Sequence, residues 1–154
     1  MDEERRRFSA FTKEDNRRLQ VLQNKVMRLK TGLPQDTPTT MLLEASSDLS
    51  VMQLTAFHTI MTVFRAVISG FPKYLHDKLA LRIPGQNDRL IPQRQTHTIQ
   101  VPNGNLTLSR GGFIFRGATL WNMMPVDLRT EQKVTVFKGK VKHWIKEHIR
   151  HKPP

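Results

Sequence analysis

Apolar residues recur at steps of three and four over several stretches of the chain, a spacing that predicts amphipathic helices. The first such stretch covers residues 12–31: Thr12 and Asp15 form a predicted N-terminal cap, and Gly32 marks the end. One stripe of this predicted helix carries Leu19, Leu22, Val26 and Leu29, and the opposite face carries Arg17, Arg18, Lys25 and Arg28. The cationic face has two interpretations of similar weight, a solvated surface and a binding surface.

The residue pattern in the middle of the chain predicts three further helices. Residues 37–46 form a short one, with Thr37 as the cap and Pro38 at the first helical position. A capping box of Ser50 and Gln53 then begins the most apolar helix, which runs to Gly70 and is expected at the centre of the core. Its core-facing residues are Leu54, Phe57, Met61, Phe64 and Ile68, and His58 is expected to be a packed or rim residue. A short helix starts at Pro72 and ends by about Leu81.

Residues 82–97 lack periodicity, contain two prolines and a glycine, and predict a long surface loop. The alternating residues that follow, separated by a turn-forming Pro-Asn-Gly-Asn, predict one β-hairpin near residues 98–109. Its buried face is predicted to hold Ile99, Val101, Leu106 and Leu108.

After Gly111 and Gly112 the chain is predicted to begin as an extended segment and then to form a short helix over residues 118–123, which Pro125 ends. Residues 126–129 are predicted to form a turn. The last stretch predicts a basic amphipathic helix whose apolar stripe holds Phe137, Val141, Trp144, Ile145 and Ile149. Lys138, Lys142 and Lys146 step by four along another side of this helix. Gly139 lies inside it, at a cost of roughly 1 kcal/mol relative to alanine.

These elements predict a mainly α fold, a small multi-helix domain of about five to six helices with one β-hairpin. We expect a flexible N-terminus of mixed charge over residues 1–11, a single helical domain over 12–150 and a tail over 151–154. Hydrophobic residues make up 38% of the chain and aromatic residues 7%, so the core should be modest.

The formal net charge of +12 indicates a polyanionic partner, with nucleic acid favoured over a membrane surface. Both ends of the chain are basic, whereas residues 31–81 are nearly neutral. Lysines at four-residue steps would form an electrostatic ridge that contacts phosphates with little base specificity. Because Phe137 and Trp144 fall on the apolar stripe, stacking on unpaired bases is not predicted. The candidate nucleic-acid-binding residues are Arg17, Arg18, Lys25, Arg28, Lys138, Lys140, Lys142, Lys146 and Arg150.

Several classes of chemistry are not supported by the sequence. The chain has no cysteine, its acidic residues are scattered over cap and turn positions, and its six histidines lack metal-ligand spacing. It contains no phosphate-binding glycine loop. We therefore expect no catalytic residue, metal, cofactor or small-molecule substrate. With no apolar signal core and no run long enough for a membrane span, a nuclear or cytoplasmic location is expected.

Four segments, in order, resemble a known family. They are "LQVLQNKVMRL" (19–29), "LSVMQLTAFHTIMTVFRAVISGFPKYL" (49–75), "RGATLWNMMPVDLR" (116–129) and "FKGKVKHWI" (137–145). Together they are similar to the C-terminal tail of non-LTR (LINE-like, jockey-type) retrotransposon reverse transcriptases. Trp121, Asn122, Pro125 and Phe137 are the residues that carry the family pattern most clearly. The chain departs from that pattern at Met124, where leucine is usual, and at Lys133-Val134, where the family often has a capping serine.

The resemblance implies a piece of an RNA-directed DNA polymerase that lies after the polymerase core. Such polymerases hold their catalytic metals through an Asp-Asp pair, and this sequence contains none, so no catalytic residue carries over. The implied function is a non-catalytic module that binds template RNA or an RNA–DNA hybrid. Two alternatives stay open: a structural module that packs on the polymerase core, and a degenerate retroelement fragment without activity of its own.

Trp121 has two possible roles, a binding platform and a core anchor. Its helical spacing with Leu120 and Met124 favours the core anchor. Asn122 would then be free to bond a nearby backbone group, with Pro125 ending the helix.

Overall fold

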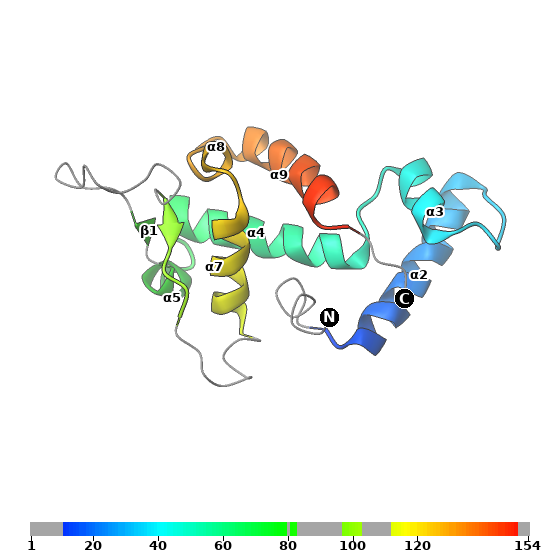
Figure 1. Cartoon of the computed structure of the whole chain (residues 1–154), viewed down its shortest axis with the longest axis horizontal. Helices are drawn as coiled ribbons and strands as arrows, with labels where there is room; N and C mark the ends of the chain where they lie inside the picture. Colours follow the sequence, from blue (N-terminus) through cyan, green and yellow to red (C-terminus); the bar gives the residue numbers. More distant parts are fainter. Residues whose placement is uncertain (1–10, 80, 83–96, 103–111, 151–154) are drawn as a thin grey trace.

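A computed structural model of the chain describes residues 11–79, 81–82, 97–102 and 112–150, and it is mainly helical, as predicted (Figure 1). The elements in chain order are α2 (Lys13–Thr31), α3 (Thr39–Ser46), α4 (Val51–Ser69), α5 (Lys73–Lys78), β1 (Leu81–Arg82), β2 (Thr98–Ile99), α7 (Phe113–Met123), α8 (Val126–Arg129) and α9 (Val134–His148). The described residues thus hold seven helices. The one beyond our expectation is the four-residue α8, which we predicted as a turn.

Helix α4 is the centre of the core, and both α7 and α9 pack against it (Figure 1). The predicted capping box of Ser50 and Gln53 begins α4, and Gly70 ends it in the left-handed conformation at φ 68°. Phe64 of α4 stacks on Phe137 of α9, with 4.0 Å between the ring centroids. The predicted stripe is buried at Phe57, Met61 and Phe64, but Ile68 in the last turn is exposed.

Helix α4 is also long and apolar enough, by length and composition alone, to cross a membrane. Half of its apolar window is buried inside the described fold, however. We predicted no apolar run of this length, and α4 differs from that expectation. A core helix passes the same test of length and composition, so the test alone does not assign α4 to a membrane.

Helix α9 follows its prediction closely. All five residues of its apolar stripe are buried: Phe137, Val141, Trp144, Ile145 and Ile149. Lys133 is its N-cap and makes no capping hydrogen bond, as expected from the missing serine. The far end is held by Gln53, whose Nε2 donates to the carbonyl oxygen of Ile149 at 2.6 Å.

Helix α7 begins at Phe113, five residues before the predicted start at Ala118. Aromatic and β-branched residues at 113–115 favour an extended chain locally, but packing on α4 stabilises the helix instead. Gly117 permits this packing, because a Cβ atom there would lie 2.8 Å from Cγ2 of Val63. The helix therefore depends on a contact that local spacing does not reveal.

Two glycine-to-alanine substitutions should have opposite effects on stability. Gly117→Ala forces the buried Val63 to move and should lower the free energy of unfolding by about 1–3 kcal/mol. Gly139→Ala, inside α9 with nothing within 4 Å of the added methyl group, should raise it by roughly 0.5–1 kcal/mol. Urea denaturation followed by circular dichroism measures both. Equal shifts for the two variants would contradict the close packing of α7 on α4.

The β structure differs from the predicted hairpin. Strand β2 pairs antiparallel with β1, with Leu81 opposite Ile99, so a strand stands where we expected the long loop to begin. Residues 83–96 of that loop and the second hairpin strand with Leu106 and Leu108 lie outside the described residues. Ile99 is buried, as predicted, and Val101 packs against the core.

The side chain of Asn122 extends this small sheet. Its Oδ1 accepts from the Ile99 amide and its Nδ2 donates to the Ile99 carbonyl oxygen, both at 2.8 Å. The neighbouring Trp121 donates from Nε1 to the His97 carbonyl oxygen at 2.8 Å. The predicted backbone bond of Asn122 is therefore confirmed, and it joins α7 to β2.

Helix α2 packs on α3 and on α4. The capping box of Thr12 and Asp15 and the left-handed Gly32 at the ends of α2 are as predicted. The orientation of α2 is not as expected, because its stripe of Leu19, Leu22, Val26 and Leu29 faces solvent. The buried residues of α2 are Gln20 and Met27.

Polar side chains hold α2 in this orientation. Gln23 Nε2 donates to the Leu49 carbonyl oxygen at 2.6 Å, and Gln20 Oε1 accepts from the Val51 amide at 3.0 Å. Asn24 Nδ2 donates to Thr39 Oγ1 at 2.7 Å. These bonds would be lost if α2 turned its apolar stripe inward.

Two helix starts are displaced by about one residue from their predictions. Pro38 and Pro72 are the N-caps of α3 and α5 rather than their first helical residues. Both prolines have extended ψ angles, which suits a cap position. Helix α5 ends at Lys78, before the predicted Leu81.

Candidate nucleic-acid interface

Three lysines of α9 form a line on its exposed side, here called the lysine ridge: Lys138, Lys142 and Lys146. The buried stripe of α9 sets the rotation of the helix and so directs this side outward. Steps of four residues advance each lysine about 6 Å along the axis and about 40° around it. The predicted alignment of these three cations is therefore present on the surface.

The ridge ends at the loop between α3 and α4. Lys146 Nζ donates to the Ser47 carbonyl oxygen at 3.3 Å. Lys30, from the last turn of α2, reaches the same loop, with its Nζ 3.1 Å from the Ser46 carbonyl oxygen and 3.2 Å from Asp48 Oδ2. The structure thus brings Lys30, which sequence analysis did not select, next to the ridge.

Asp48 is the acidic residue at this junction. Partial burial raises the pKa of its carboxyl group, but the Lys30 ammonium group, Ser46 and the charge of Lys142 together lower that pKa further, so the net shift is downward. The carboxylate is therefore ionised at neutral pH and offsets part of the positive charge where Lys30 and the ridge meet.

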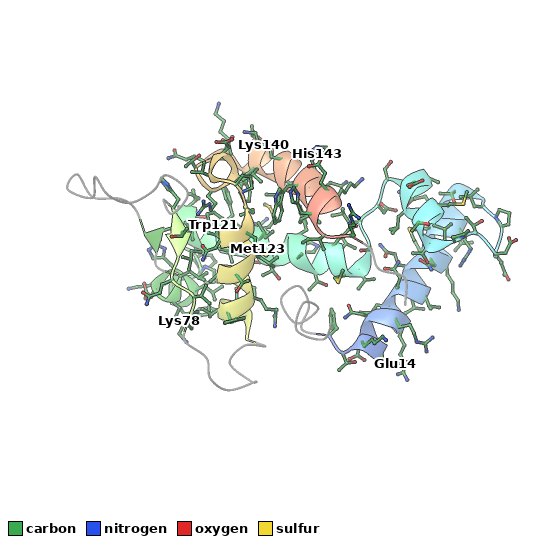
Figure 2. The ribbon with its side chains drawn as sticks, in the orientation of Figure 1. Glu14, Lys78, Trp121, Met123, Lys140 and His143 are labelled. Carbon is green, nitrogen blue, oxygen red and sulfur yellow. The ribbon has the colours of Figure 1, made fainter. Side chains whose placement is uncertain are left out.

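The opposite flank of α9 is different, because its basic side chains lie against carboxylates. Lys140 Nζ lies 3.1 Å from Glu131 Oε2, and His143 Nε2 lies 3.0 Å from Glu147 Oε1. The pKa of Glu131 is lowered by the Lys133 backbone amide and by Lys140. Figure 2 shows Lys140 and His143 on the outer side of α9. Lys140 is thus less available for phosphate than the ridge.

The cations predicted on α2 do not form one site. Arg17 and Arg18 both bind Glu14, at 2.9 Å and 3.0 Å, and these hydrogen bonds lower the pKa of Glu14 to about 2. Glu14 lies at the start of α2, remote in Figure 2 from the labelled residues of α9. Arg28 is half-buried, and its Nη2 donates to the Thr37 carbonyl oxygen at 3.2 Å. Lys25 is exposed on α2, and Arg150 is exposed just after α9.

The residues that carry the family pattern are structural. Trp121 and Phe137 are fully buried, with 6.0 Å between their ring centroids, and Pro125 is the N-cap of α8. Arg116 and Arg129, at the two ends of segment 116–129, are also buried, and burial lowers the pKa of both. This segment therefore builds the core rather than a binding surface.

Exposed aromatic residues occur away from the ridge. Phe71 is 74% exposed in the turn between α4 and α5, and Tyr74 is 66% exposed in the first turn of α5, beside the exposed Lys73. These two residues were not among our predictions, because base stacking was considered only for the aromatic residues of the last helix. Phe137 and Trp144 are buried as predicted, so α9 itself offers no ring for base stacking.

The described part of the chain holds no cluster of three or more His, Asp or Glu side chains that could bind a metal. An open cleft of about 510 Å³ lies between α2 and α4. It is lined by apolar side chains, including Leu19, Leu54 and Phe113, and by polar ones, including Gln23 and Thr55. His58 lies on its wall and is exposed, in agreement with a rim position.

Comparison of the chain with protein-family models, curated proteins and solved structures found no match. The resemblance to retrotransposon reverse transcriptases therefore stays a prediction that rests on the four segments of the sequence.

Proposed function

We propose that this chain is a non-catalytic module of a retroelement reverse transcriptase that binds RNA or an RNA–DNA hybrid through phosphate contacts. The observation that carries the proposal is the lysine ridge of α9, which is exposed and continues to Lys30. Its assignment to a reverse transcriptase rests on the order of the four family-like segments.

The dimensions of the ridge suit a phosphate backbone. Its three lysines span about 12 Å along the helix axis, a length over which one nucleic-acid strand presents roughly three to four charges. Ammonium groups bind phosphates as point charges and do not read bases. The ridge therefore supports binding that depends on charge and backbone geometry.

An A-form helix fits this mode of recognition. Its major groove is too narrow for side chains to read, so double-stranded RNA is contacted mainly through phosphates, 2′-hydroxyl groups and overall shape. A short row of lysines on a rigid helix can follow one strand of such a duplex. The same row would contact a hybrid or a single strand with less shape selectivity.

The affinity for nucleic acid should fall steeply with salt. Fluorescence anisotropy with labelled single-stranded RNA, duplex RNA and RNA–DNA hybrid, over about 50–200 mM KCl, measures this dependence. Three to four phosphate contacts predict a slope of log K against log salt of about −2 to −4. An affinity that does not change with salt, or no binding to any of the three probes, would contradict the proposal.

A second candidate, a protein-interaction module that packs on a polymerase core, is favoured by a different observation. The exposed leucine and valine stripe of α2 has no covering element in the described structure. Phosphate binding offers no role for such a stripe.

A further inference from the structure

The exposed stripe of α2 consists of Leu19, Leu22, Val26 and Leu29, and it is here called the α2 stripe. These side chains are 37%, 57%, 63% and 88% exposed, so exposure increases toward the C-terminal end of the helix. Contiguous exposed apolar surface on a folded domain commonly marks an interaction site. The hydrogen bonds of Gln20, Gln23 and Asn24 hold this stripe on the outside.

The spacing of the α2 stripe is that of a coiled-coil seam. Steps of three, four and three place Leu19 and Val26 at heptad positions a, and Leu22 and Leu29 at positions d. The opposite side of the helix faces α3 and α4 through Gln20, Asn24 and Met27. Helix α2 thus has one face bound within the fold and one heptad seam left exposed among the described residues.

The charges at positions e and g, on either side of the seam, determine which partner helix is compatible with it. Position g is occupied by Arg18 and Lys25, and position e by Gln23 and Lys30. In a parallel pair of identical α2 helices Lys25 would face Lys30, and in an antiparallel pair Lys25 would face Arg18, so like charges meet in both arrangements. A second copy of the chain is therefore disfavoured, and acidic flanks on the partner are favoured.

The surface at the N-terminal end of the seam is concave. Leu19 lines the cleft between α2 and α4 together with Leu54, Val51 and Phe113. A concave, apolar end next to a narrow a/d seam suits a helical partner that lies along α2. A lipid surface would instead contact a convex and broader apolar face.

From this geometry we propose that the α2 stripe docks an amphipathic helix of another protein segment, with leucine-type residues in heptad spacing and acidic residues on its flanks. The apolar seam supplies the contact. Arg18 and Lys30 are paired with Glu14 and Asp48, so Lys25 is the main cation that selects the acidic partner. The seam lies on α2 and the lysine ridge on α9, and the two meet only at Lys30, which is held by Asp48. One chain can therefore hold nucleic acid and a protein helix together.

The test uses the full chain and a synthetic helical peptide of about three heptads, with leucine at a and d and glutamate at e and g. A matched peptide has lysine in place of glutamate. Isothermal titration calorimetry should show binding of the acidic peptide at least tenfold tighter than binding of the basic one. Leu22→Gln with Leu29→Gln should weaken binding of the acidic peptide at least tenfold without unfolding the chain, since both side chains are exposed.

A charge-swapped variant tests the selection itself. Arg18→Glu with Lys25→Glu should reverse the preference, so that the lysine-flanked peptide binds tighter. Absence of binding by the acidic peptide overturns the proposal. So does dimerisation of the chain that is lost in the Leu22→Gln and Leu29→Gln variant, which would identify a second copy as the partner. Flotation with anionic phosphatidylserine vesicles that is lost in the same variant, without peptide binding, would identify a membrane instead.

Discussion

Replacing Trp121 with alanine is expected to lower the free energy of unfolding by about 3–5 kcal/mol. The indole ring is fully buried and packs near Phe137, so its removal leaves a large cavity between α7 and α9. It also removes the donor to the His97 carbonyl oxygen and weakens the attachment of β2 to α7. Urea denaturation followed by far-ultraviolet circular dichroism measures the change.

Two further variants serve as comparisons for Trp121→Ala. Trp121→Phe keeps much of the apolar volume but loses the indole N–H, and it should cost less than Trp121→Ala. Met123→Ala changes an exposed residue of the same helix and should cost under about 1 kcal/mol. A Trp121→Ala variant as stable as the parent would overturn the assignment of this residue to the core.

Replacing Lys138, Lys142 and Lys146 together with glutamine should weaken RNA binding roughly 30- to 100-fold at about 0.1 M salt. Each lost phosphate contact removes a share of the counterion release, so the salt slope should also become shallower by about 2–3. The three side chains are exposed, and stability should change by less than about 0.5 kcal/mol. Fluorescence anisotropy over a salt series measures both quantities.

A matched control removes the same charge elsewhere. Arg17, Arg18 and Lys140 are held by Glu14 and Glu131, so replacing these three with glutamine should weaken RNA binding far less than the ridge variant does. Asp48→Asn should act in the opposite direction and strengthen binding a few-fold, because it removes the carboxylate beside Lys30 and Lys142. Equal losses for the two triple variants would show that net charge, rather than the ridge, determines affinity.

Charge reversal of the ridge tests whether this surface binds nucleic acid or protein. If Lys138→Glu, Lys142→Glu and Lys146→Glu together abolish RNA binding, the phosphate-binding proposal is supported. If RNA binding survives and association with a polymerase core is lost, the ridge is a protein-docking surface.

Much of the candidate site could be predicted from local pattern. The apolar stripe of α9 specifies which side of that helix is buried, and the lysines four residues apart then have to lie together on the outside. Pairing with acids was not predictable in the same way. Glu131 and Lys140 are nine residues apart in the sequence, and Asp48 and Lys30 are eighteen apart. Only the packing of the helices brings these groups together.

The sequence by itself determined where most helices lie and the orientation of α9, because capping boxes, left-handed glycines and apolar periodicity act within a few turns of chain. Tertiary structure decided the start of α7, the pairing of β1 with β2 and the face that α2 presents. In α2 the side that faces the fold carries polar groups beside Met27. Gln20, Gln23 and Asn24 satisfy backbone and hydroxyl groups of distant segments, and the larger apolar stripe is left outside. A hydrophobic pattern cannot reveal such an orientation, since it records which residues are apolar but not which distant polar groups need a hydrogen-bond partner.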